Sequence, residues 1–151
     1  MIAFRFREHL RGTFWMLDAP LDERAIDLVL EATSLPLRAF ARERKARLKG
    51  RAALERTAHD VPVEGTLTFR LRDEQCVRYE VTFTTDDGRR LRLRGDKDLG
   101  RWYAPADAVS TLPASLYDEN GREVGRAVVR WDVRAEAGTL LKSFRLRLAL
   151  S

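Results

Sequence analysis

The two histidines and the one cysteine are the side chains best suited to metal binding or covalent catalysis. His9 and His59 lie far apart in the sequence, and neither stands at a metal-ligand spacing from another His, Cys or carboxylate. Cys76 has no second cysteine to pair with and no nucleophile motif around it, although His59 could lie near it in the fold. The sequence therefore predicts no metal site and no catalytic residue, and Cys76 is interpreted as a small residue at the start of a strand.

Acidic residues are abundant, and paired carboxylates are the usual machinery of general acid–base catalysis. Asp18 and Asp22 lie in a Pro-containing loop, and Asp86 and Asp87 lie in a Gly-containing turn, where Asp side chains stabilise the turn. Catalysis would need them in a water-excluding pocket with shifted pKa values. The sequence also has no Gly-rich phosphate loop before a helix and no nucleophile-elbow serine. We expect a non-enzymatic protein without a cofactor.

Five aromatic residues are the main positive signal for a binding function. They all fall on the apolar side of alternating segments: Phe14, Phe69, Tyr79, Phe83 and Trp131. If those segments close into a barrel, the five rings point into it together. Two interpretations remain open, because such rings either form a packed core or line a cavity for one apolar molecule.

Lys97 joins the candidate ligand-binding residues because of its setting. It stands between two acids in the segment 95–99, at the end of an amphipathic strand, where it could place one charge at a barrel mouth. A solvated turn is nevertheless the preferred interpretation of this segment. Trp15, Trp102 and Tyr103 lie near strand ends or loops and could rim an opening.

The elements that position these residues show a period of two, which is typical of strands with one buried and one wet face. The alternation is clearest in four segments, 67–72, 77–84, 127–133 and 144–150. Weaker alternation covers five others, 2–6, 12–17, 26–30, 46–54 and 90–94. Nearly the whole chain is therefore predicted to be strand.

Two turns predict that consecutive strands are antiparallel. Residues 86–88 (Asp-Asp-Gly) and 119–122 (Glu-Asn-Gly-Arg) are too short for a crossover helix, and Asn-Gly accepts the positive φ angles of a tight hairpin. One short helix is predicted over 34–42, with Ser34 as N-cap and Pro36 in the first turn.

Residues 22–33 permit two interpretations, since they contain good helix formers. The alternation of Ile26, Leu28 and Leu30 with polar residues favours a strand.

The predicted architecture is thus mainly β: one domain over 1–151, an antiparallel, lipocalin-like barrel of about eight to ten strands with one short helix. A β-sandwich is the alternative. Closure is favoured by glycines within strand patterns, at Gly12, Gly50, Gly65, Gly95 and Gly125.

Composition narrows the classes of function. The net charge is +5, but acidic residues are interspersed nearly everywhere except in the basic segment 42–51. The motifs and exposed aromatic platforms of nucleic-acid-binding domains are missing, so we expect no nucleic-acid partner. No run approaches the roughly 18 apolar residues of a membrane span. With one cysteine and no secretory signal pattern, a cytoplasmic location is expected.

Several segments together resemble a bacterial β domain that accompanies flavin-dependent oxidoreductases of the glucose-methanol-choline, cholesterol-oxidase-like class. The matching segments cover most of the chain, at 47–50, 60–67, 78–90, 95–98, 110–113 and 141–145. The flavin-binding glycine pattern and the histidine-bearing catalytic region of those enzymes are absent here. The resemblance implies an accessory role beside such a flavoprotein, presenting or binding a sterol-like or other lipid molecule.

Three hypotheses follow. The chain is a barrel that binds an apolar ligand or assists a flavoprotein, or it is a solidly packed module that acts by docking or self-association, or it is an enzyme with an unrecognised site. A filled interior would count against ligand binding. A buried cluster of titratable groups would favour the enzyme, because such groups seldom lie inside an apolar barrel without a function.

Overall fold

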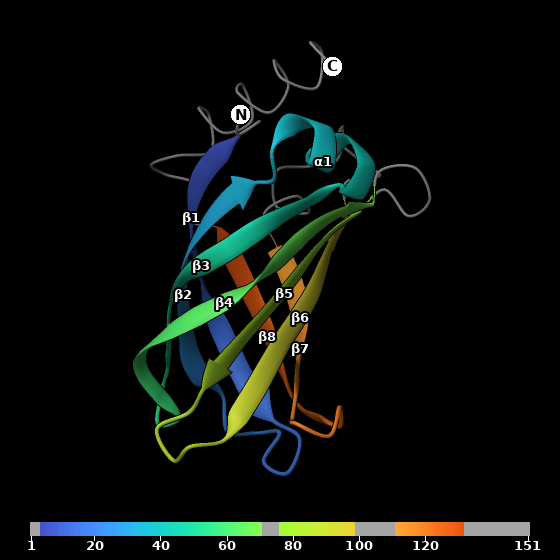
Figure 1. Ribbon diagram of the computed structural model, residues 1–151. Coiled ribbons are helices and arrows are strands. Elements are labelled where there is room, and N and C mark those ends of the chain that lie inside the picture. Colours follow the sequence, from blue (N-terminus) through green and yellow to red (C-terminus); the bar gives the residue numbers. More distant parts are fainter. Residues whose placement is uncertain (1–3, 71–75, 99–110, 132–151) are drawn as a thin grey trace.

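In the computed structural model, residues 4–70, 76–98 and 111–131 are described, and they form a closed antiparallel barrel with one short helix (Figure 1). The elements in chain order are β1 (Arg5–Met16), β2 (Arg24–Ser34), α1 (Leu37–Glu43), β3 (Lys45–Leu54), β4 (Ala58–Arg70), β5 (Cys76–Thr84), β6 (Arg90–Asp98), β7 (Thr111–Tyr117) and β8 (Glu123–Trp131). Each strand pairs with the next, and β8 pairs with β1 to close the barrel. The prediction of an antiparallel barrel is confirmed, and the sandwich alternative is wrong.

Alternation along each strand sends one set of side chains into the barrel and the other into solvent. In β5, for example, Val77, Tyr79, Val81 and Phe83 are buried. The largest side chains that are almost fully buried are Phe14, Phe83, Leu10, Ile26, Leu28, Leu30, Leu48, Leu54, Leu67, Leu91, Leu93 and Leu116. They belong to one continuous core, so the apolar faces pack against one another across the barrel.

Several predicted boundaries change. Segments 2–6 and 12–17 were expected to be separate strands, but residues 5–16 form the single strand β1. Residues 24–34 are strand, as the alternation favoured. The strand β7 at 111–117 was not predicted, although buried Leu112, Ala114 and Leu116 alternate with Pro113 and Ser115 on the outer face. The predicted strand over 144–150 lies outside the described residues.

Glycines on the inner side of the wall let neighbouring strands come very close. A Cβ added at Gly12 would lie 1.9 Å from the Val128 carbonyl oxygen, and one added at Gly65 would lie 1.8 Å from that of Glu80. Real side chains do not tolerate such contacts, so only glycine allows the wall to coil this tightly at these two points.

The helix α1 follows β2 and lies over one end of the barrel (Figure 1). Ser34 is not its N-cap, which corrects the prediction. Ser34 ends β2, its hydroxyl oxygen accepts a hydrogen bond from the Phe4 amide at 3.0 Å, and the N-cap position is Pro36. The helix ends at Arg44, whose left-handed conformation (φ 54°) turns the chain into β3. In the described part of the chain, no helix is long and apolar enough to span a membrane.

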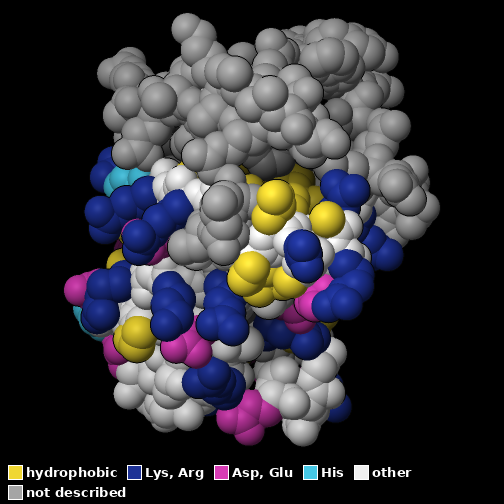
Figure 2. Space-filling view, turned by 45° about the horizontal axis from the view of Figure 1, so that its top comes forward, with side chains coloured by type: hydrophobic (Ala, Val, Ile, Leu, Met, Phe, Trp, Pro, Cys, Tyr) yellow, Lys and Arg dark blue, Asp and Glu magenta, His cyan; other side chains and the backbone are white. Residues whose placement is uncertain are grey.

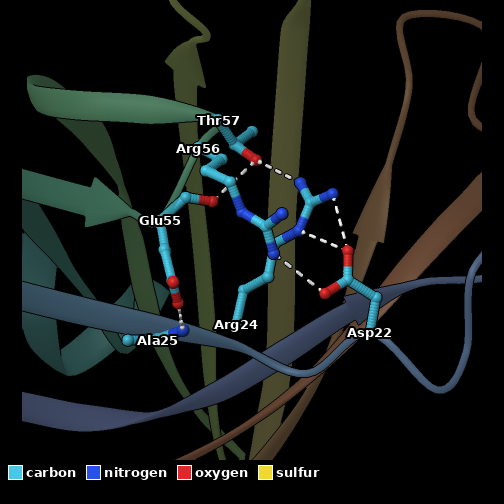
Figure 3. A network of polar contacts seen from close by, with 6 residues as sticks. All are labelled: Asp22, Arg24, Ala25, Glu55, Arg56 and Thr57. Carbon is cyan, nitrogen blue, oxygen red and sulfur yellow. Dashed lines mark hydrogen bonds and ion pairs between the residues drawn. The ribbon is translucent and has the colours of Figure 1, made fainter.

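Hairpins lie at the opposite end of the barrel, which we call the hairpin end. Gly88 and Gly121 adopt φ angles of 87° and 78° in the two turns predicted from their sequences. Figure 3 shows the hydrogen bonds and ion pairs that connect the segments at this end. Asp22 accepts hydrogen bonds from Arg24 (3.0 Å) and Arg56 (2.9 Å), which links the start of β2 to the β3–β4 turn. The Arg24 hydrogen bond and the nearby positive charges lower the pKa of Asp22.

Candidate ligand site at the helix end of the barrel

The six candidate ligand-binding residues separate into two groups. Phe14 and Phe83 lie deep toward the hairpin end, where both are fully enclosed by the core. Phe69, Tyr79, Lys97 and Trp131 instead project from the strand ends nearest α1. The first group packs the barrel, so only the second remains a candidate site.

A hydrogen bond between Tyr79 and Glu8 crosses the barrel interior. Glu8 is on β1 and Tyr79 on β5, and these strands lie on opposite sides of the eight-stranded ring. The Tyr79 hydroxyl lies 2.9 Å from Oε2 and 3.1 Å from Oε1 of Glu8, and both residues are buried. A phenol that donates to a carboxylate gives a strong, charge-assisted bond, so this pair braces the barrel below its α1 end.

Lys97 and Trp131 lie beside this brace. Lys97 is only 6 % exposed, and its Nζ atom lies 2.7 Å from the centre of the Trp131 ring, a cation–π contact. Among the described residues, the buried Trp131 Nε1 has no hydrogen-bond acceptor. A buried hydrogen-bond donor without an acceptor is a rare and costly state in folded proteins, and here it lies next to a buried lysine.

Burial changes the acid–base properties of the cluster. Loss of hydration lowers the pKa of Lys97 to about 8, although the charge of Glu8 acts in the opposite direction. Loss of hydration and the Glu8 carboxylate both raise the pKa of Tyr79 well above its usual value. At neutral pH the amine is therefore largely protonated and the phenol keeps its proton. Both groups act as hydrogen-bond donors and not as nucleophiles.

Four phenylalanines close the barrel on the α1 side. Phe4 contacts Phe6, Phe40 and Phe69, and Phe40 also contacts Phe69, with ring centroids 5.2 to 5.7 Å apart. Three of the four contacts are edge-to-face, the geometry that aromatic rings prefer. Phe40 is the side chain through which α1 joins this apolar layer, so the helix and the candidate site share one wall.

Sequence reasoning missed Glu8, the acid at the centre of the cluster. The sequence pattern does mark this residue, because Glu8 occupies the inward position between Phe6 and Leu10 in β1. A carboxylate on an otherwise apolar strand face indicates a buried partner. The interpretation of residues 95–99 as a solvated turn was also wrong. Residues 96–98 belong to β6, where Asp96 faces outward to bind Arg78 at 2.7 Å and Lys97 faces inward.

The remaining chemistry-bearing residues form separate surface contacts. His9 lies 2.6 Å from Asp27, and His59 bonds Asp86 at the hairpin end. Cys76, a buried thiol that forms no disulfide, begins β5 at the α1 end, so His59 is far from it. Within the described ranges no three His, Cys, Asp or Glu side chains are grouped as metal ligands. Trp15 is half-buried near the end of β1, and Trp102 and Tyr103 lie outside the described residues.

Hollows on the described surface lie away from the cluster. One is a shallow groove along the β2–β3–β4 edge, bounded by Ala25, Leu54 and His59, and another lies at Pro20 and Leu21 in the β1–β2 loop. Both are open to solvent and belong to the hairpin end. Neither contains a predicted ligand-binding residue, so we do not assign a function to them.

Lys97 should give stability a distinct dependence on pH. Its folded pKa of about 8 lies below the ordinary 10.5, so the folded state holds this proton more weakly than the unfolded state does. The resulting penalty is complete below pH 8 and is relieved as the pH rises toward 10.5, by up to about 3 kcal/mol. We expect the unfolding free energy of the wild type, minus that of Lys97→Met, to rise across this interval in urea titrations. A flat difference would contradict a desolvated Lys97.

No protein-family model, curated protein or solved structure matches this chain in sequence or fold comparisons.

Proposed function

We propose that this chain is a non-enzymatic binding barrel that holds an apolar, lipid or sterol-like molecule by an oxygen-bearing group at the α1 end. One observation carries the proposal: Trp131 Nε1 is a buried donor without an acceptor among the described residues, and it lies beside the buried side chain of Lys97. A carboxylate, carbonyl or hydroxyl oxygen would accept a hydrogen bond from Trp131 Nε1 and lie next to the charge of Lys97. The phenylalanine layer offers an apolar surface for the rest of the molecule.

The protonation states of Tyr79 and Lys97 favour binding over catalysis. The notion of an unrecognised enzyme gains support from the buried cluster itself. However, Tyr79 is held as a donor to Glu8, and Lys97 is mainly protonated at neutral pH. A protonated amine and a fixed phenol orient a ligand oxygen, but they supply no general base or nucleophile at that pH.

The resemblance to the β domain of glucose-methanol-choline oxidoreductases supports a role beside such an enzyme. In this proposal the flavoprotein performs the redox chemistry, and the barrel holds or presents the lipid molecule. A reducing, cytoplasmic compartment fits a chain whose one cysteine, Cys76, forms no disulfide.

A second candidate function is a packed module that acts by docking or self-association. It is favoured by the continuous core, in which Phe14 and Phe83 fill the hairpin half and leucines such as Leu48 and Leu67 extend the packing toward α1. That packing limits a ligand to the α1 end. The two candidates differ in whether an apolar molecule accompanies the folded protein.

The test is native mass spectrometry and lipid extraction of the purified protein, followed by melting curves with a panel of fatty acids and sterols. A ligand present at a hundred times its dissociation constant should stabilise the wild type by about 2.7 kcal/mol. Lys97→Met retains the apolar volume but removes the charge, so its response should be much weaker. Arg122→Met, a charge removed from the hairpin end, is the control that should respond like the wild type.

The proposal fails if no molecule co-purifies and no compound in the panel changes the melting temperature. In that case a concentration-dependent dimer in analytical ultracentrifugation would support the packed docking module instead.

A further inference from the structure

Five cations lie close together where α1 joins β3. They are Arg38, Arg42, Arg44, Lys45 and Arg47, and we call them the basic rim. Glu43 is the single acid within the stretch 38–47. Four of the five make no ion pair with any described residue, and the fifth, Arg42, lies 3.9 Å from Glu43. The rim is therefore a concentration of positive charge beside the candidate site that the described acids leave largely uncompensated.

On the outer face of β3, the described residues opposite two of the rim cations are neutral. Arg47 lies between Thr33 on β2 and Thr66 on β4, and Lys45 lies opposite Thr68. Directly opposed residues on one face of a sheet are the ones whose side chains interact. Here they are neutral, so both cations project into solvent with their full charge.

Farther from α1, acidic residues neutralise the positive side chains of the same strand. Lys49 lies between Glu31 and Glu64, and Arg51 binds Asp60 at 2.7 Å. The change from acidic to neutral neighbours occurs within a single strand, at the end nearest the helix. Net positive charge is thus confined to the α1 end of β3 and does not cover the whole strand.

An exposed apolar side chain accompanies the rim. Leu37 begins α1 and is 54 % exposed, although a leucine is normally buried. Figure 2, which brings the upper end of the barrel forward, shows hydrophobic side chains beside Lys and Arg side chains on the visible surface. Cations around an exposed leucine suit a lipid surface, where charges meet head groups and the leucine enters the acyl boundary. Nucleic acid would use the charges but not the leucine.

We propose that the basic rim docks the barrel on an anionic lipid surface, with Leu37 inserted at the contact. Each Lys or Arg at such a surface strengthens binding roughly fivefold, and four to eight clustered cations are typical of peripheral lipid-binding sites. Docking would place the α1 end of the barrel against the lipid. The contact is peripheral and depends on charge, so salt should weaken it.

The experiment is sedimentation of the full chain with vesicles made of equal parts phosphatidylcholine and phosphatidylserine. The wild type should bind these vesicles, release at high salt, and not bind phosphatidylcholine alone. The triple variant Arg38→Glu, Lys45→Glu, Arg47→Glu should bind about a hundredfold more weakly. Leu37→Ser should weaken binding severalfold and leave the salt dependence unchanged.

A matched control reverses three cations at the hairpin end, Arg89→Glu, Arg90→Glu and Arg122→Glu, and should bind within a few fold of the wild type. Circular dichroism establishes that both triple variants are folded. Equal losses in the two variants would mean that total charge governs binding, and the rim proposal would be wrong. It would also be wrong if the wild type bound a DNA duplex but not the anionic vesicles at the same salt concentration.

Discussion

Phe83→Ala is expected to lower the free energy of unfolding by about 3–5 kcal/mol. Phe83 is 1 % exposed and belongs to the continuous core that fills the hairpin half of the barrel. Its truncation removes apolar contacts and leaves a cavity that the paired strands of a closed barrel cannot easily collapse to fill. Urea denaturation followed by far-ultraviolet circular dichroism measures the loss.

Leu21→Ala provides the matched control, because Leu21 is 97 % exposed and should change stability by less than about 0.5 kcal/mol. If Phe83→Ala costs less than about 1 kcal/mol, the interior around it is loosely filled. That result would extend the candidate ligand site from the α1 end into the body of the barrel.

Gly65→Ala is expected to cost at least about 3 kcal/mol, near the upper range for overpacking substitutions. The added methyl group would lie 1.8 Å from the Glu80 carbonyl oxygen, an atom of the neighbouring β5 backbone. Relief requires β4 and β5 to separate, which would break their hydrogen bonds. The urea midpoint compared with that of the wild type gives the size of the effect.

Gly88→Ala is the matched control, because it introduces backbone strain without a steric clash. Nothing lies within 4 Å of a Cβ at Gly88, but its φ of 87° is unfavourable for other residues. We expect a loss of about 1–2 kcal/mol from the left-handed conformation alone. If Gly65→Ala were no more harmful than Gly88→Ala, the strands would not approach as closely at Gly65 as the structure indicates.

Local patterns in the sequence predicted the barrel because its strands pair in chain order. The alternation in 77–84, the Asn-Gly turn and the inward glycines each depend on residues near one another in the sequence. Where the local pattern was interrupted, prediction was weaker. Strand β7 contains Pro113, a residue that disfavours strands, and Ser34 resembles an N-cap although its hydroxyl oxygen accepts a hydrogen bond from the Phe4 amide.

The candidate site was harder to predict because its members come from distant strands. Tyr79, Lys97 and Trp131 were predicted from their faces on individual strands, but the partner of Tyr79 is 71 residues away at Glu8. That pairing depends on which strands oppose each other across a closed ring. Closure is a property of the whole sheet, so no single segment reveals it.

The seam between β1 and β8 also has consequences for how the chain reaches its native state. Every other strand pair joins neighbours in sequence and can form as a hairpin soon after its residues leave the ribosome. The seam joins Gly12 to Val129, so it forms only after nearly the whole barrel has been synthesised. Until then β1 and the most recently formed strand present unpaired edges, which can pair with other chains. Aggregation during synthesis should therefore depend on how fast this last pairing is completed, even though the finished barrel has no free edge.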